Sequence, residues 1–222
     1  MIYLVYGFIC GFAIPYIARR FNKFMPATLG YAIYKILKPV KRSKVISLKK
    51  RHLLKKYFYR SVLIGLIVGF LFYVFSLRFG GSGLFLKLLF VWLLVLLSEI
   101  DHRMMLLPDI ITFPLVLLGF FASLYAFSFT NVIDSSLGSL VGYFLPVFAS
   151  MLLVWKNKDA FGGGDIKFLA VIGAWCGVDK LLFVIMLASI SFGVYALLKK
   201  QRAGAFGPWL SFATLAVLIL FS

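Results

Sequence analysis

The chain has 222 residues, of which 63% are hydrophobic and 14% are charged, with a mean hydropathy of +1.01. A soluble domain usually carries about 25% charged residues, so this composition excludes an ordinary water-soluble globular protein. The balance of 24 Lys and Arg against 7 Asp and Glu gives a net charge of +17, which we attribute to basic loops at anionic lipid, with no nucleic acid as a partner.

The long apolar runs predict an all-α fold, a polytopic membrane bundle of about eight transmembrane helices. These helices are expected at 2–18, 60–77, 84–100, 109–128, 136–155, 166–178, 181–198 and 205–221. The first has no basic start and leads into a basic stretch, so we expect a retained span and not a removable signal peptide. The sixth is short for a bilayer crossing and is expected to be tilted or partly buried.

The segment after the first helix is basic and contains no acid. Within it, 24–37 is too short to cross the bilayer easily and suits a short amphipathic helix at the membrane surface. We expect 38–60 to lie along the inner leaflet. The chain is therefore divided into 1–60, the first transmembrane helix with a basic cytoplasmic loop, and 61–222, a membrane-embedded core.

The distribution of Lys and Arg predicts the orientation in the membrane. When the predicted helices alternate in direction, 21 of these residues fall on one side, in or next to the loops 19–60, 101–108, 156–165 and 199–204. The other side keeps only Arg78, Lys87 and Lys180. Because basic loops stay in the cytoplasm, we assign the first side to the cytoplasm and both chain ends to the outside.

The seven acids are the most informative residues, because carboxylates near membrane helices are costly and mark functional sites. Five of them lie at the inner ends of predicted helices: Glu99, Asp101, Asp109, Asp159 and Asp165. Asp101 ends the third predicted helix and Asp165 opens the sixth, at a similar depth. Two carboxylates that approach each other cannot both ionise cheaply, so one holds a proton near neutral pH. Such a pair suits the hydrolysis of a peptide bond by water. The alternative interpretation is that the two acids lie at the membrane surface and have no relation to each other.

Other residues near this pair have both structural and functional interpretations. Asp109 follows Pro108, which suits the start of a helix whose positive dipole end faces the carboxylate. Glu99 lies two residues before Asp101, so only one of the two is expected to face a shared interior. Three roles are open for Lys167: orienting a substrate, pairing with a carboxylate, or anchoring the chain at the cytoplasmic surface.

Three glycines, Gly162, Gly163 and Gly164, precede Asp165. They allow unusual backbone angles and the close approach of another chain. A phosphate loop is disfavoured, because nearby acids would repel an anion and the pattern G-x-x-x-x-G-K-[ST] is absent. We therefore expect the loop to let an extended peptide lie beside the carboxylate.

No metal site is expected from the sequence. Cys10 and Cys176 lie in separate apolar segments and form no C-x-x-C pair, which argues against zinc. No Ser-His-Asp arrangement and no H-E-x-x-H motif supports a serine or zinc hydrolase.

Three stretches resemble the type IV prepilin leader peptidases, a family of membrane aspartyl proteases of the GxGD type. The stretch EIDHRMMLLPDIITFPL resembles the family's first aspartate motif. The stretch FGGGDIKFLAVIGAWCG resembles its second aspartate motif, the G-x-G-D-x-K element. The stretch AFGPWLSFA at 205–213 resembles the motif of its last span. The likeness covers roughly 84–221, and the two aspartates are 64 residues apart, as in the family.

This resemblance implies a multi-pass protein of the bacterial inner membrane. Such a protein cleaves the short basic leaders of type IV prepilins or type II secretion pseudopilins, after a glycine and at the cytoplasmic face. The catalytic pair would be Asp101 and Asp165, and the expected partners are these substrates and the anionic lipid of the inner leaflet. The supporting residues would be Asp109, Lys167, Gly162 and Gly164.

Many family members also methylate the new N-terminus with S-adenosylmethionine, the one cofactor that the resemblance implies. Proteolysis itself implies no cofactor. Two departures leave methyl transfer open. The first cytoplasmic loop lacks the two C-x-x-C pairs of many members, and Gly11-Phe12-Ala13-Ile14-Pro15 stands in place of their G-S-F-L-N.

Two other functions remain open on the sequence. One is an ion-coupled transporter or channel that uses the inner-face aspartates, and the other is a non-catalytic membrane protein of a secretion assembly. A transporter usually binds ions near the bilayer midplane, whereas these acids lie at helix ends beside loops. An assembly protein has no need of a glycine loop before an acid. Both points favour the peptidase.

Overall fold

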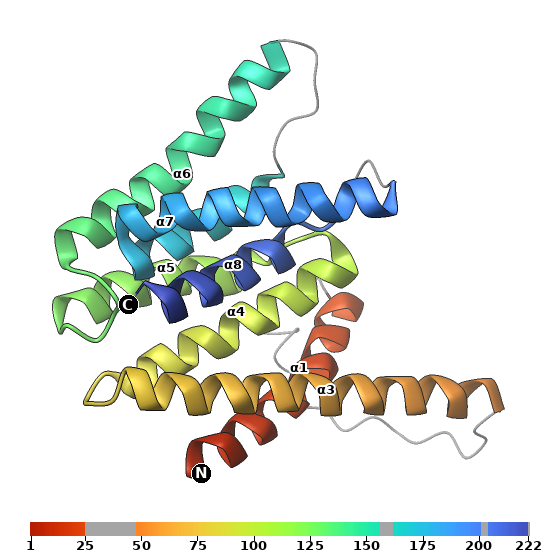
Figure 1. Cartoon of the computed structure of the whole chain (residues 1–222). Helices are drawn as coiled ribbons and strands as arrows, with labels where there is room; N and C mark the ends of the chain where they lie inside the picture. The colour runs from red at the N-terminus through yellow and green to blue at the C-terminus, as the bar shows by residue number, and fades with distance from the viewer. Residues whose placement is uncertain (25–47, 156–161, 201–203, 222) are drawn as a thin grey trace. The chain divides into compact units, whose positions relative to one another are not determined.

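The computed structural model describes residues 1–24, 48–155, 162–200 and 204–221. All regular structure in these ranges is α-helical, as the composition predicts (Figure 1). The chain forms two compact units, Met1–Phe79 and Gly80–Ser222. The acids and the glycine loop that the sequence singles out all belong to the second unit.

The first unit is a pair of helices, α1 (Ile2–Phe24) and α3 (Leu48–Arg78), that contact each other closely. A Cβ added to Gly7 on α1 would lie only 2.8 Å from the Cα of Gly69 on α3, so glycines allow the two backbones to approach. The short helix expected at 24–37 lies outside the described residues beyond Phe24. The expected boundary at residue 60 falls inside α3, whose helix begins twelve residues before the predicted span.

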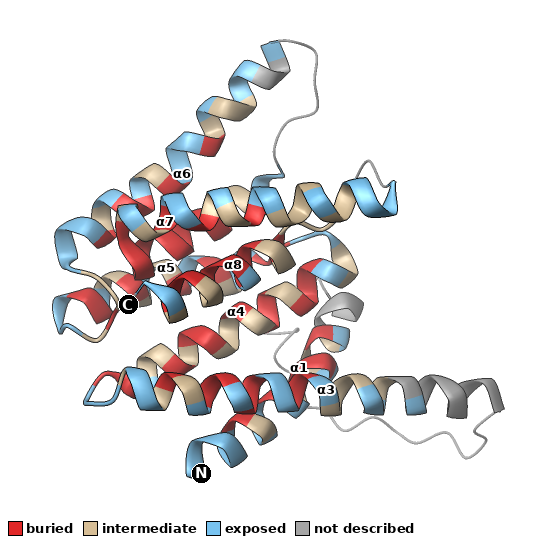
Figure 2. Cartoon of the chain, viewed as in Figure 1, coloured by how far each residue is buried: buried red, intermediate tan, exposed pale blue. Residues whose placement is uncertain are grey.

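The second unit contains the helices that the apolar runs predict. They are α4 (Leu84–Met104), α5 (Asp109–Leu124), α6 (Val132–Trp155), α7 (Gly163–Lys199) and α8 (Gly207–Leu220). Buried residues gather along α4, α8 and the first half of α7 (Figure 2). This unit therefore has an internal core, although its outer surface is apolar as well.

Trp175 is the centre of that core and connects three helices. Its side chain on α7 is fully buried. Its indole N–H donates a 2.9 Å hydrogen bond to the carbonyl oxygen of Leu115 on α5. Its ring stacks on Phe90 of α4, with 4.5 Å between the ring centroids. A buried tryptophan needs such a partner for its N–H, and here the partner also fixes α7 against α5.

Glycines also set the contact between α6 and α7. A Cβ on Gly173 of α7 would overlap the carbonyl oxygen of Gly138 on α6, and a Cβ on Gly142 would overlap that of Leu169. Small residues at a helix interface let membrane helices pack by close backbone contact. The α6–α7 interface is thus built from backbone against backbone.

The helix α7 contains the two predicted spans 166–178 and 181–198, and it changes direction at Gly177, close to the end of the first. Gly177 has φ 81° and ψ 177°, a conformation that residues with a side chain rarely adopt. A Cβ at this position would also lie 2.6 Å from the Oγ1 of Thr130. Gly177 therefore marks the boundary that the sequence placed a few residues later.

Four of the described helices are long and apolar enough to cross a membrane, within Ile2–Arg20, Tyr57–Arg78, Val132–Leu152 and Gly163–Lys199. Large apolar side chains cover much of the outer surface, among them Leu117 and Phe148, which are 67% and 62% exposed. Such a surface is unfavourable in water and favourable in lipid. The all-α polytopic membrane fold is confirmed, and the count of eight spans stays a prediction.

Candidate functional site

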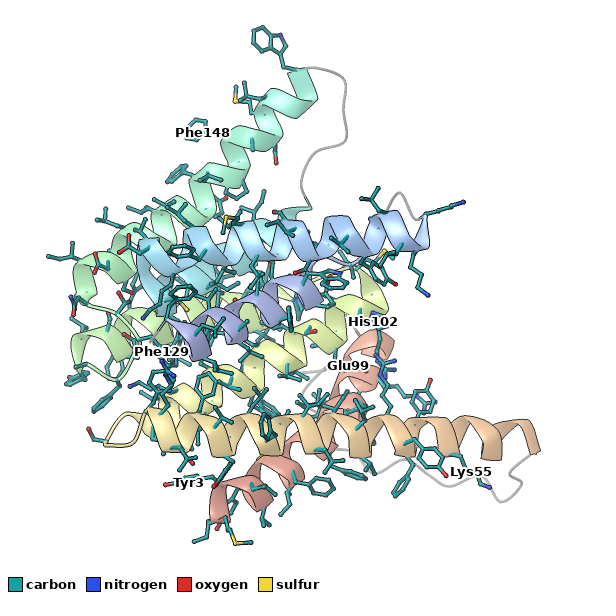
Figure 3. All side chains as sticks on the ribbon, in the orientation of Figure 1. Tyr3, Lys55, Glu99, His102, Phe129 and Phe148 are labelled. Carbon is teal, nitrogen blue, oxygen red and sulfur yellow. The ribbon has the colours of Figure 1, made fainter. Side chains whose placement is uncertain are left out.

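Three helix ends meet at one end of the second unit: the C-terminal end of α4 and the N-terminal ends of α7 and α8. α4 brings Asp101, α7 brings Asp165, and α8 begins at Gly207. Figure 3 labels His102, the neighbour of Asp101, at this end of the unit and Phe129 at the opposite end. Asp134 and Asp179, the two acids at the outer ends of the predicted helices, lie beside Phe129, so among the described residues they are separated from Asp101 and Asp165 by the length of the helices.

Asp101 is almost fully buried, at 4% exposure, near the last turn of an otherwise apolar helix. Its Oδ2 accepts a 2.8 Å hydrogen bond from the backbone N–H of Gly207. The Oγ of Ser211, one turn further along α8, donates a 3.1 Å bond to the carbonyl oxygen of Leu94 on α4. These two bonds fix the start of α8 to α4 beside the carboxylate.

Asp165 lies in the first turn of α7 and is partly buried. Its backbone N–H donates a 3.0 Å hydrogen bond to the carbonyl oxygen of Gly162, which closes the first turn. The negative charge of Asp101 acts on the Asp165 carboxylate. The structure therefore brings the two acids, 64 residues apart in sequence, close enough for their charges to interact.

The glycine loop before Asp165 does not use unusual backbone angles. Gly162, the residue before the helix, has φ −62° and ψ 131°, which any residue can adopt. Space is the constraint at Gly164, where a Cβ would lie 3.2 Å from the Cβ and 3.3 Å from the backbone nitrogen of Leu107. At Gly163 no described atom lies within 4 Å of such a Cβ. Gly164 therefore lets the segment between α4 and α5 approach α7.

Lys167 and Asp109 form an ion pair between α7 and α5. The Lys167 Nζ donates to the Asp109 Oδ1 at 2.6 Å, with side chains 32% and 55% exposed. Asp109 is also the first residue of α5, directly after Pro108, as the helix-start interpretation predicts. Of the roles open for Lys167, pairing with a carboxylate is the one that the structure contains.

Because this ion pair is exposed, we expect it to contribute little to stability. Lys167→Met should lower the free energy of unfolding by about 1 kcal/mol or less, and Asp109→Asn by a similar amount. Equilibrium unfolding of the two single variants and the double variant in mixed micelles measures the coupling between them. A coupling well above this range would show that the pair is screened from solvent.

The charged residues of α4 next to Asp101 are paired within the helix or exposed. Glu99 is buried, and its Oε1 accepts bonds from Arg103 on the same helix, at 2.7 Å from Nε and 2.6 Å from a terminal nitrogen. His102 is exposed. Among the described residues no group of three or more His, Cys, Asp or Glu has the arrangement of a metal site.

Gly207 is the site residue that sequence reasoning did not identify. It lies 106 residues from Asp101, and neither residue type nor spacing points to the contact between them. The only signal is its place in the stretch AFGPWLSFA. That stretch could be recognised by resemblance, but its contact with Asp101 depends on the fold.

Comparison with known proteins gives matches over this part of the chain. Residues 88–197 match the model of the type IV leader peptidase family. The prepilin leader peptidase/N-methyltransferase of Escherichia coli strain K12 is 36% identical over 142 residues, which are 60% of this chain and 61% of the relative. The protein of that name from Dickeya chrysanthemi is 35% identical over 174 residues, 73% of this chain and 60% of the relative.

The matched part of the chain is only a portion of these relatives. The protein of the same name from Dichelobacter nodosus is 36% identical over 131 residues, 57% of this chain and 45% of the relative. The chain thus spans about half to three fifths of the length of the relatives it matches. No solved structure gives a significant match.

Proposed function

Because the chain belongs to the type IV leader peptidase family through residues 88–197, we propose that it is an aspartyl endopeptidase acting on prepilins or type II secretion pseudopilins. It removes their short basic leader. The names of the relatives support a prepilin substrate, since each is a prepilin leader peptidase. The peptidase core lies within 61–222, which includes every acid of the chain.

The observation that carries this proposal is the pair formed by Asp101 and Asp165. The first is buried beside the start of α8, and the second lies in the first turn of α7, where the charge of the first acts on it. Two carboxylates in one partly buried site share a proton, and this is the arrangement that aspartyl proteases use. A transporter site near the bilayer midplane would place its acids away from the helix ends.

In the proposed reaction one aspartate is ionised and the other is protonated. The ionised one takes a proton from water as the water oxygen bonds to the scissile carbonyl carbon, and the other gives its proton to the carbonyl oxygen. The aspartate that took the proton from water then gives it to the leaving nitrogen as the C–N bond breaks. The other aspartate regains a proton from a hydroxyl group of the diol. One water is consumed, and the pair returns to its starting state.

The site faces the cytoplasm of a bacterial inner membrane in this proposal. Asp101 and Asp165 lie at the ends of the predicted helices where the connecting loops are rich in Lys and Arg. Such loops stay in the cytoplasm, which supports this orientation. A prepilin leader in the cytoplasm would reach the site from these loops. The basic loop itself is proposed to lie on the anionic lipid of the inner leaflet.

Methyl transfer is left out of the proposal, although the relatives are named N-methyltransferases. The first unit has a cavity of about 460 Å³ lined by aromatic side chains, including Tyr16, Tyr57 and Phe58, with Arg19 as its one charged residue. No acidic side chain lines this cavity, since no acid precedes Glu99.

The glycines before Asp165 provide a matched pair of variants. Gly164→Ala should lower the cleavage rate about tenfold, because its Cβ would push Leu107 and shift the segment next to Asp101 by a few tenths of an ångström. Gly163→Ala should stay within about twofold of wild type, because its Cβ meets no described atom. Equal losses in both variants would show that the substrate backbone, and not Leu107, needs this space.

The proposal is tested with the purified chain in proteoliposomes and a synthetic prepilin that carries its leader. Mass spectrometry should find two fragments produced by one cut between leader and mature sequence. A prepilin with its leader charges removed serves as the comparison, and it should be cleaved more slowly. If a folded chain leaves the prepilin intact, the proposed function is wrong.

A further inference from the structure

The Asp101 carboxylate touches the backbone of α8 so closely that only glycine fits. Its Oδ2 accepts the buried hydrogen bond from the Gly207 N–H at 2.8 Å. A Cβ added to Gly207 would lie 2.7 Å from that oxygen and 3.0 Å from both the Cβ and the Cγ of Asp101. The Asp101 side chain has two torsions and is buried at 4% exposure, so it could avoid such a methyl group only by moving its carboxylate.

The amide that contacts Asp101 is itself held in place. Pro208 follows Gly207 in the first turn of α8 and restricts the backbone there. The bond from the Ser211 Oγ to the Leu94 carbonyl fixes the next turn of α8 to the helix that carries Asp101. The donor and the acceptor are therefore both on rigid elements.

The two aspartates differ in the partners of their carboxylates. Among the described residues we find no hydrogen-bond donor to the Asp165 side chain. The positive N-terminal end of α7 stabilises a negative charge on Asp165, and that of α8 does the same for Asp101. Asp101 also lies near the negative C-terminal end of α4, which opposes its charge. A direct N–H bond to a carboxylate is stronger than a dipole that only lies nearby. The balance therefore favours the negative charge on Asp101.

We propose that the Gly207 amide makes Asp101 the ionised member of the pair, and hence the general base, and leaves the proton on Asp165. The inference rests on the proposed peptidase function. Asp101 takes the proton from water and later returns it to the leaving nitrogen. Asp165 gives its proton to the carbonyl oxygen and regains one from the diol. Gly207 is a positioning residue, since it acts through Asp101 and not on the substrate.

Other charged groups also lie at this end of the second unit. The charge of His102 acts on Asp101, and the charge of Asp101 acts on Asp165. α8 contains no titratable side chain. Lys167 is paired with Asp109 and Arg103 with Glu99, and Lys199 and Lys200 lie at the C-terminal end of α7.

The first test measures the protonation of each aspartate directly. The full chain is labelled with ¹³C at its aspartate carboxyl carbons and observed by NMR in detergent at pH 7. The signal lost in Asp101→Asn identifies Asp101, and the signal lost in Asp165→Asn identifies Asp165. Asp101 should have the chemical shift of a carboxylate and Asp165 that of a carboxylic acid. The reverse assignment would overturn the inference whether or not prepilin is cleaved.

The second test uses Gly207→Ala, with Gly204→Ala, in the segment that leads into α8, as its matched control. Gly207→Ala should lower kcat about tenfold or more and keep KM within about twofold, because the base moves while the substrate contacts remain. A Cβ on Gly204 would lie 3.5 Å from the Phe192 ring, an ordinary contact, so Gly204→Ala should behave as wild type.

The two tests separate this inference from the proposed function. A normal kcat in folded Gly207→Ala would contradict the positioning role. If that variant does not fold, the NMR assignment of the wild-type chain still decides which aspartate is ionised. Absence of cleavage by wild type would contradict the function alone, because the protonation states are observed without substrate.

Discussion

Asp101→Asn and Asp165→Asn are each expected to lower the rate of prepilin cleavage by about 10²- to 10⁴-fold. Asparagine has nearly the size of aspartate but neither accepts nor gives a proton near neutral pH. Its side-chain carbonyl can still accept the hydrogen bond from Gly207, so the fold should be retained. The loss is therefore chemical and should appear in kcat, measured by the appearance of the mature fragment.

Asp179→Asn is the control for this pair. Asp179 is on the same helix as Asp165 but beyond the kink at Gly177, and it is exposed. The same change of charge at this position should leave the cleavage rate within about twofold of wild type, as surface substitutions usually do. If Asp101→Asn or Asp165→Asn is as stable as wild type and still cleaves prepilin at a near-normal rate, the two-aspartate mechanism is wrong.

Gly173→Ala is expected to be the most destabilising small substitution in the described chain. Its Cβ would overlap the carbonyl oxygen of Gly138, so α6 and α7 would have to separate along their closest contact. Overpacking of a tight interior typically costs about 1–3 kcal/mol, and we expect the upper end because the obstacle is backbone. Equilibrium unfolding in mixed micelles measures this loss.

Gly193→Ala provides the comparison on the same helix. No described atom lies within 4 Å of a Cβ at Gly193, and alanine is preferred to glycine in a helix by about 0.5–1 kcal/mol. This variant should therefore be as stable as wild type or more so. If Gly173→Ala proved equally harmless, the close contact between α6 and α7 would not describe the folded protein.

The helices could be predicted from the sequence because a bilayer leaves few choices to the backbone. Apolar runs must form helices there, since every backbone N–H and C=O needs a partner within the chain. The start of α5 at Asp109 could be predicted as well, because a proline followed by an acid is typical of a helix start. The start of α3 at Leu48 did not, because hydropathy detects only the apolar part and its first turns are basic.

The candidate site could be predicted only in part. The two acids were recognisable because carboxylates are rare in this chain and both lie at helix ends. The partner of Lys167 was not, because Asp109 is 58 residues away and several acids were within reach. The role of Gly207 was hidden for the same reason: its contact with Asp101 uses a backbone amide, which every non-proline residue has.

The most direct test of the central claim is whether Asp101 and Asp165 act as one unit. The measurement is the cleavage rate of a synthetic prepilin in proteoliposomes that contain wild type, Asp101→Asn, Asp165→Asn or the double variant. Residues of one catalytic unit are strongly non-additive. Both single variants and the double variant should share the same low residual rate. Independent losses that multiply in the double variant, or a single variant that cleaves like wild type, would contradict the claim.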